Sequence, residues 1–391
     1  MKRTKVKNAF LGLVIIYLSF TACSKTDDSG NEEYIPITGV NLPENYFNYA
    51  NPNIPSYITK DNTGTNNITN PTATLGRVLF YDKNLSDNKK VSCASCHKQS
   101  HGFSDSAIQS IGKDGVSTPR HSMRLINSRF SNEVRFFWDE RAISLEDQTT
   151  QPIKDHIEMG FGGKNGDPTF DDLITRMEST TYYPQLFNNA FGNSDINEEK
   201  MQIALAQFVR SIQSFDSRFD NGLNAVGGNN INQDFPNFTA EENQGKQLFL
   251  RAPNIGGAGC VTCHQAPEFD IDPNTLNNGI IGVASTTTEI DLTNIRSPSL
   301  RDLVREDGTP NGPFMHDGSL TTLLDVINHY NLIPVNNLNT NLDPRLRGPQ
   351  GTASNQSLNL TDDEKNALVD FLKTLSGTDV YVNEKWSDPF E

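Results

Sequence analysis

Basic residues and long apolar runs are both scarce in this chain of 391 residues. It carries 33 Lys and Arg against 48 Asp and Glu, a formal net charge of -15. Such an acidic surface repels nucleic acid and anionic lipid, which argues against a nucleic-acid-binding role. The one sustained apolar run, residues 9–20, is too short to span a bilayer as a helix. A membrane-spanning anchor is therefore not expected.

The first residues nevertheless have the pattern of an exported protein. Basic residues precede the apolar run, and Ala22 and Cys23 follow it, which predicts a signal peptide over residues 1–22. Cys23 resembles a lipoprotein cysteine and predicts a lipid anchor, the alternative being that it is discarded with the signal. Removing residues 1–22 takes away four basic residues and leaves 29 against 48 acidic ones, a net charge of -19. We expect a bacterial cell-envelope protein, periplasmic or lipid-anchored to the outer membrane.

Strand-like alternation is also scarce, so the expected fold class is mostly α with long loops. Two segments repeat one plan: each opens with Gly-x-x-Leu-Phe, at Gly76 and Gly245, and each closes on an amphipathic helix, residues 201–214 and 362–375. The repeat predicts two small helical domains in tandem. The expected boundaries are a tether over 23–70, domains at 71–220 and 241–380, a linker at 221–240 and a tail at 381–391.

Only five cysteines are present, and four of them form two Cys-x-x-Cys-His motifs. The motif residues are Cys93, Cys96 and His97, and Cys260, Cys263 and His264. This spacing is typical of covalent haem c, in which the thiols add to the porphyrin vinyl groups and the His binds the iron. A zinc site would not need a His directly after each pair, and a thioredoxin-like motif would need a βαβ context. Two haems c are therefore predicted, with both domains of cytochrome c type.

The chain resembles bacterial di-haem cytochrome c peroxidases and the related MauG-like enzymes. Beyond the haem motifs, the matching stretches are residues 79–82, 137–142, 145–148, 158–160 and 313–319. The resemblance implies an N-terminal haem at which peroxide reacts and a C-terminal haem that delivers electrons.

Peroxide reduction needs an open iron site and a nearby acid or base that moves a proton between the peroxide oxygens. The resemblance implies that Glu158 transfers this proton, that Gln148 orients the peroxide and that Pro152 shapes the pocket. It places Trp138 between the haems as an electron relay. The alternatives are a surface carboxylate for Glu158 and a buried aromatic anchor for Trp138.

The first haem is expected to be five-coordinate. Many family members block it with a His from the loop after the first motif, but residues 104–119 contain no His here. His101 is too close to His97 to reach the other haem face. His121 is expected to contact the loop or a propionate rather than the iron.

Two residues compete as sixth ligand of the second haem. Ligand chemistry favours Met315, the only Met after Cys263. The family pattern favours Tyr330, as in MauG-like enzymes, and a phenolate would favour the ferric and higher oxidation states. A hydrogen-bonded core Tyr is the remaining alternative for Tyr330.

A calcium ion is also implied by the resemblance, with Asn311 and Pro313 at the matching positions. His121 falls where the family commonly has an Asn ligand, and Asn127 is the proposed substitute.

The leading functional hypothesis is a hydrogen-peroxide-reducing enzyme that takes electrons from a small cytochrome c, a cupredoxin or a quinol. The rival hypotheses are MauG-like oxidation of a protein side chain and a non-catalytic electron carrier. The expected partners further include a second copy of the chain, as a homodimer, and no nucleic acid.

Overall fold

The computed structural model describes residues 36–284, 286–349, 352 and 354–390. The predicted signal peptide and Cys23 lie outside these residues. Helices dominate the described part, as expected, and the only strands in it form two antiparallel pairs, β1–β2 and β3–β4. The helices are α1 Asn70–Tyr81, α2 Cys93–Cys96, α3 Leu145–Lys154, α4 Phe170–Glu178, α5 Tyr183–Phe191, α6 Glu198–Ser211, α7 Arg218–Ala225, α8 Ala240–Leu250, α9 Leu323–Asn331, α10 Asp362–Lys373 and α11 Asp379–Val382. The strands are β1 His264–Gln265, β2 Asp270–Ile271, β3 Gly282–Val283 and β4 Thr286–Ile290.

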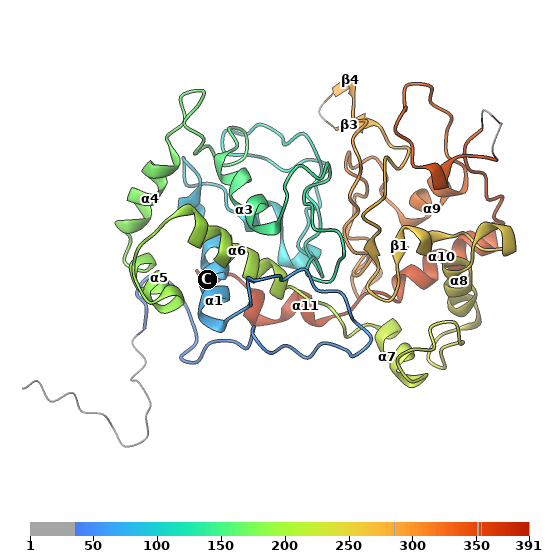
Figure 1. Cartoon of the computed structure of the whole chain (residues 1–391), viewed down its shortest axis with the longest axis horizontal. Coiled ribbons are helices and arrows are strands. Elements are labelled where there is room, and N and C mark those ends of the chain that lie inside the picture. Colours follow the sequence, from blue (N-terminus) through green and yellow to red (C-terminus); the bar gives the residue numbers. More distant parts are fainter. Residues whose placement is uncertain (1–35, 285, 350–351, 353, 391) are drawn as a thin grey trace, which may run out of the picture. The chain divides into compact units, whose positions relative to one another are not determined.

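Two helix pairs repeat the same packing, α1 with α6 and α8 with α10 (Figure 1). Gly76 of α1 faces the carbonyl oxygen of Ala204, and a Cβ at Gly76 would lie only 2.0 Å from it. Gly245 of α8 meets Ala367 in the same way, at 1.9 Å. Each glycine therefore allows two helix backbones to approach closely, which explains why Gly-x-x-Leu-Phe occurs twice.

Capping residues set the starts of these helices. Thr69, Asn197, Thr239 and Thr361 each accept a backbone N–H with the side chain, before α1, α6, α8 and α10. The helix expected from residue 201 begins three residues earlier, at Glu198, because Asn197 supplies the cap.

The buried apolar residues form two large clusters, one in each half of residues 37–391. The first contains the inner faces of α1 and α6, and the second those of α8 and α10. Phe219 and Leu223 of α7 already belong to the second cluster, so the change of core precedes the expected linker at 221–240. We refer below to residues 37–216 as the first half and to 217–375 as the second half.

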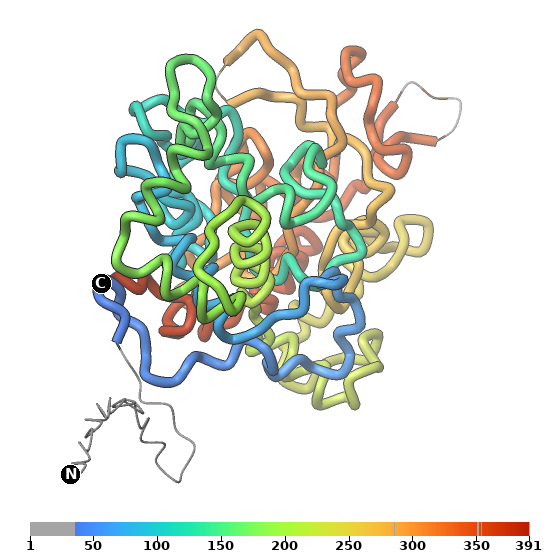
Figure 2. Tube along the Cα trace, turned by 60° about the vertical axis from the view of Figure 1, so that its left-hand side comes forward, coloured from blue at the N-terminus to red at the C-terminus, as the bar shows by residue number. Residues whose placement is uncertain are grey.

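The C-terminal segment returns to the first half instead of ending as a free tail. Trp386 is 1% exposed in the first core, and its Nε1 donates to the carbonyl oxygen of Ser211 at 3.1 Å. Pro389 accepts the backbone N–H of Asn41 at 2.7 Å, so both ends of the described chain meet there (Figure 2).

The described residues 37–69 contain no helix or strand, and residues 57–62, the crossing segment, contact both halves (Figure 1). Tyr57 Oη donates to Asp220 in α7 at 2.7 Å, and Lys60 Nζ donates to Asp270 in β2 at 2.5 Å. The segment thus binds the second half.

The same segment returns at once to the first half. Asp61 forms an ion pair with Arg129 at 2.6 Å, and Asn62 accepts from Arg210 of α6 at 3.1 Å. The crossing segment therefore links the hairpin after the second Cys-x-x-Cys-His motif to the first core.

Within the described residues, no helix is both long enough and apolar enough to cross a membrane.

Candidate functional site

The first Cys-x-x-Cys-His motif forms the single helical turn α2, capped by Ser92. His97 follows directly, and its Nδ1 lies 3.2 Å from the carbonyl oxygen of Phe103. Because a carbonyl only accepts, Nδ1 carries the proton and Nε2 keeps its lone pair for a metal. Burial lowers the pKa of His97 to about 4, which holds the ring neutral, as an iron ligand must be.

The second motif differs in its histidine environment. Cys260–Thr262 form a tight turn, and His264 opens β1, which pairs with β2. Burial lowers the pKa of His264 to about 4, yet its Nδ1 is buried without a hydrogen-bond partner among the described residues. Unlike Nδ1 of His97, this nitrogen therefore has no described carbonyl oxygen that fixes the proton on it.

The four motif cysteines are free thiols, and burial raises the pKa of each of them. Cys93 and Cys260 reach about 12. A structural zinc site needs thiolates, and the described residues contain no group of three or more His, Cys, Asp or Glu placed to hold a metal ion. The neutral sulfurs fit the uncharged thioether links of haem c instead.

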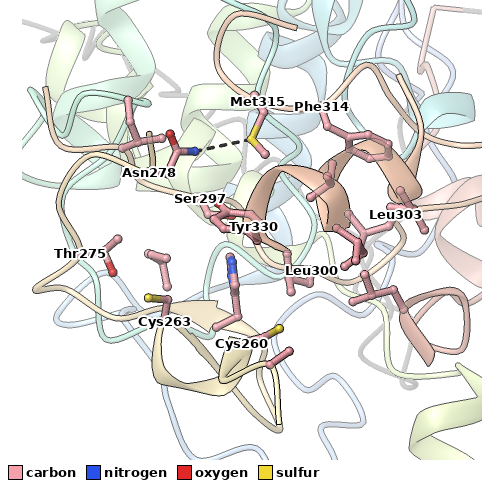
Figure 3. A pocket seen from close by; sticks show the side chains of 18 of the residues that line it. Cys260, Cys263, Thr275, Asn278, Ser297, Leu300, Leu303, Phe314, Met315 and Tyr330 are labelled. Atoms are coloured by element: carbon pink, nitrogen blue, oxygen red, sulfur yellow. Dashed lines mark hydrogen bonds between the residues drawn. The ribbon is translucent and has the colours of Figure 1, made fainter. Parts of the chain in front are cut away.

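A largely apolar cavity of about 360 Å³ adjoins the second motif (Figure 3). Residues of both halves line it. The second half contributes Cys260, Cys263, His264, Leu300, Leu303 and Phe314, and the first half contributes Ser104, His121, Ser122, Arg124 and Trp138. Apolar walls with few polar groups suit a large planar cofactor.

Both predicted sixth ligands line this same cavity. Tyr330 comes from α9, and Met315 from a loop in which its φ is +71°. Figure 3 shows their side chains in the cavity beside Cys260 and Cys263, with Asn278 Nδ2 3.5 Å from the sulfur of Met315. Burial raises the pKa of Tyr330. The geometry keeps both residues as candidates.

A smaller cavity, of about 70 Å³, adjoins the first motif. Its lining includes Cys93, Cys96 and His97 together with Gln148, Pro152 and Glu158. Gln148 and Pro152 are four residues apart in α3 and so share one helix face, and Glu158 comes from the loop after α3. All three residues assigned by resemblance to the peroxide pocket therefore face the first motif.

Glu158 is the titratable carboxyl of this cavity. Burial raises its pKa to about 7, Asp155 adds to the shift and the charge of Arg141 opposes it. No described group donates a hydrogen bond to its carboxylate. A carboxyl with a pKa near neutrality can both accept and return a proton.

Pro152 and Tyr330 occupy equivalent positions in the two halves. Ser144 caps α3 and Thr322 caps α9, and Pro152 and Tyr330 each lie eight residues after their cap. The loops before these caps also match, each closed by an antiparallel bridge, Phe136 with Ala142 and Phe314 with Leu320. Where the second half presents a phenol, the first half presents a ring that cannot bind a metal.

Trp138 lies on the wall of the second cavity and not of the first. It is 9% exposed, and its Nε1 donates to the carbonyl oxygen of His121 at 2.7 Å. Its ring centroid lies 6.4 Å from that of His316 of the second half. A first-half aromatic ring thus contacts the second half beside the second motif.

Neither His101 nor His121 lines the first cavity. His121 Nδ1 lies 3.0 Å from the carbonyl oxygen of Ala107, and His101 Nε2 lies 3.1 Å from that of Gly312.

The two residues expected at a calcium ion lie close in the chain but differ in environment. Asn311 is fully buried; its Nδ2 donates to Tyr381 Oη at 2.7 Å, and its Oδ1 has no partner among the described residues. Pro313 lines the second cavity. Asn127, the expected substitute ligand, has both side-chain polar atoms hydrogen-bonded to the backbone of Ser214, so its amide is already occupied.

The chain is similar to di-haem cytochrome c peroxidases and to MauG proteins. The family model described as di-haem cytochrome c peroxidase matches residues 70–226. A methylamine utilization protein MauG of Methylorubrum extorquens is 32% identical over 79% of each chain. A cytochrome c551 peroxidase of Nitrosomonas europaea is 28% identical over 78% of this chain and 80% of its own. The crystal structure of a MauG-like protein associated with microbial copper homeostasis matches with a TM-score of 0.67 and 28% identity, covering 87% of this chain and 99% of that one.

Proposed function

Because the chain belongs to the family of di-haem cytochrome c peroxidases and MauG proteins, we propose that it reduces hydrogen peroxide at a haem c on His97. Cys260, Cys263 and His264 would hold a second haem c, which would supply the electrons for this reduction. The observation that carries the proposal is the single cavity shared by His97, both cysteines of its motif, Gln148 and Glu158. Membership of the family implies the two haems, and the neutral thiols and imidazoles fit them.

Bound haem would supply the redox chemistry at the first site. Glu158 accepts a proton from one peroxide oxygen and returns it to the other, which leaves as water. Gln148 holds the peroxide by hydrogen bonds. Pro152 contributes no ligand and keeps that face of the cavity clear. Overall, one peroxide, two electrons and two protons give two waters.

Electrons enter through the second site in this proposal, from a small cytochrome c, a cupredoxin or a quinol. Trp138 relays them to the first site, which its place on the second cavity wall supports. The net charge of -19 expected after removal of residues 1–22 favours a donor with a basic surface. We place the enzyme in the periplasm or on the outer membrane, with Cys23 as the lipid-bearing residue.

The division into c-type domains at 71–220 and 241–380 is part of the proposal, supported by the two hydrophobic cores. So is a calcium ion near Pro313, for which the unpartnered Oδ1 of Asn311 offers an oxygen ligand.

A Glu158→Gln variant tests the assignment of the peroxide site. It should keep both haems and lose most peroxide turnover, because the amide fills the same space but carries no transferable proton. Glu178→Gln, an exposed change on α4, is the control and should leave turnover unchanged. Near-normal turnover in Glu158→Gln would give Glu158 a structural role only.

A second candidate function is MauG-like oxidation of a protein side chain. Tyr330 in the second cavity and the 32% identity to a MauG protein favour it. Mass spectrometry of a candidate protein substrate after turnover would detect the added oxygen or cross-link. A non-catalytic carrier would instead show six-coordinate iron at both haems and no spectral response to peroxide.

A further inference from the structure

Arg124 is a buried cation without a partner. Arg124 is only 7% exposed, and its Nε is buried without a hydrogen-bond partner. No described residue accepts a hydrogen bond from its guanidinium or forms an ion pair with it. Two other buried arginines are ion-paired: Arg301 binds Asp220 at 2.7 Å, and Arg210 binds Glu146. Arg296 also lacks an ion pair among the described residues, but it stacks on the Phe136 ring and does not line the second cavity. An unpaired buried guanidinium is costly, so a chain that keeps one is expected to bring an anion to it.

The neighbouring acid does not supply that anion. The negative charge of Asp302 acts on Arg124, but the two side chains form no ion pair. Oδ1 of Asp302 accepts the backbone N–H of Gly377 at 3.0 Å instead. Tyr381, the other group that acts on Arg124, donates to the carbonyl oxygen of Val304 at 3.3 Å and bears no charge near neutrality.

Arg124 lies where a ligand of the second cavity would reach it. It comes from a loop of the first half, yet it lines the cavity that contains Cys260, Cys263 and His264. Ser104 and Ser122 line the same wall and add hydroxyl groups. The second half also contributes a cation to the lining, Arg345, but Arg345 is ion-paired with Asp272 and Asp343. Arg124, from the first half, is the lining cation without an ion pair among the described residues.

We propose that Arg124 binds a propionate carboxylate of the haem attached to the second motif, an inference that rests on the proposed function. A guanidinium offers two parallel N–H donors that match a carboxylate, and the pair is strongest when it is withdrawn from water. The haem held by Cys260 and Cys263 is then bound across the two halves. It joins them in addition to carrying electrons.

The test compares Arg124→Met and Arg124→Lys in the haem-loaded protein. Loss of the cation beside the propionate stabilises the ferric state, so Arg124→Met should shift the potential of the second haem downward in a spectroelectrochemical titration. The propionate bending mode of that haem in the resonance Raman spectrum should move as well. Arg124→Lys keeps the charge and should restore most of the potential, and it covers the case in which the Met variant does not fold.

Arg305→Met is the matched control, because Arg305 is half-buried nearby, lies 3.4 Å from His101 Nδ1 and does not line the cavity. It should change neither readout. An unchanged potential in Arg124→Met, or a shifted potential with an unmoved propionate mode, would overturn the proposal. Neither readout requires peroxide turnover, so the propionate contact can fail while the peroxidase proposal stands, and the reverse.

Discussion

Glu158 illustrates how burial gives an ordinary carboxyl the pKa that proton transfer requires. Its pKa of about 7 means that the carboxylate form, which would accept the peroxide proton in the proposed mechanism, is gained as pH rises through neutrality. We therefore expect kcat/KM for peroxide to rise with pH along a limb centred near 7, because this ratio reports the ionisation of the free enzyme. Steady-state rates between pH 5 and 9 would show it. A limb that persists in Glu158→Gln would assign the ionisation to another group.

Tyr330 and Met315 make opposite spectroscopic predictions. If Tyr330 is the sixth ligand, Tyr330→Phe should change the ferric visible spectrum, while Met315→Leu leaves it unchanged. A Met-ligated second haem should show the reverse pattern and a higher potential. Loss of a Met charge-transfer band in Met315→Leu, with no change in Tyr330→Phe, would favour ordinary peroxidase chemistry.

The sequence predicts local motifs well, but it predicts poorly the contacts between residues far apart in the chain. Cys93, Cys96 and His97 are adjacent, so their chemistry is evident from spacing alone. Glu158 is indicated only by the family resemblance, because it lies ten positions after Gln148, beyond the end of α3, and no periodicity brings the two together. Arg124 was missed altogether, since its lack of a partner exists only in three dimensions. The sequence could have shown the equivalence of Pro152 and Tyr330, because each lies the same number of residues after its capping residue, Ser144 or Thr322.

At the scale of elements, the helix pairs depend on glycine at the closest approach. Gly245→Ala would put a methyl group within 1.9 Å of the Ala367 carbonyl oxygen, and a backbone oxygen in a helix cannot move away easily. We expect a loss of about 3 kcal/mol or more, well beyond the ~0.4–1 kcal/mol that alanine gains through the unfolded chain. Chemical denaturation would measure it.

Gln244→Ala is the control for this change, since Gln244 is the exposed neighbour of Gly245 on α8. It should alter stability by no more than about 0.5 kcal/mol. Equal effects of the two substitutions would mean that the helices can separate at little cost. The sequence predicted these elements because Gly-x-x-Leu-Phe and the apolar faces are local patterns, whereas the exact helix starts depended on caps such as Asn197.

At the scale of the whole molecule, Lys60 holds two buried acids, Glu268 and Asp270, at the contact between the halves. Lys60→Met would leave both acids without their cation. We expect a loss of about 3–5 kcal/mol, as for other broken buried pairs, and separate unfolding of the two halves. Differential scanning calorimetry would resolve one transition into two.

Adding Asp270→Asn to Lys60→Met should recover part of the loss, because one of the unpaired charges is then removed. Lys365→Met is the control: its partner Asp362 is fully accessible, and such a pair contributes at most about 1 kcal/mol. A single unshifted transition in Lys60→Met would show that the halves hold together without the crossing segment. The sequence of residues 57–62 does not predict this contact, because the residues that Tyr57 and Lys60 bind lie far along the chain.

Because the chain is synthesised from its N-terminus, the crossing segment is made long before its partners in the second half. The ribosome makes Tyr57 163 residues before Asp220, and Lys60 210 residues before Asp270. Closing loops of that length is slow compared with the local collapse of helices. Helices α1 and α6 can therefore pair, and Asp61 and Asn62 can bind the first half, before Tyr57 and Lys60 have their partners. The contacts of Tyr57 and Lys60 are thus among the last to form, and they form only after the second half has been synthesised.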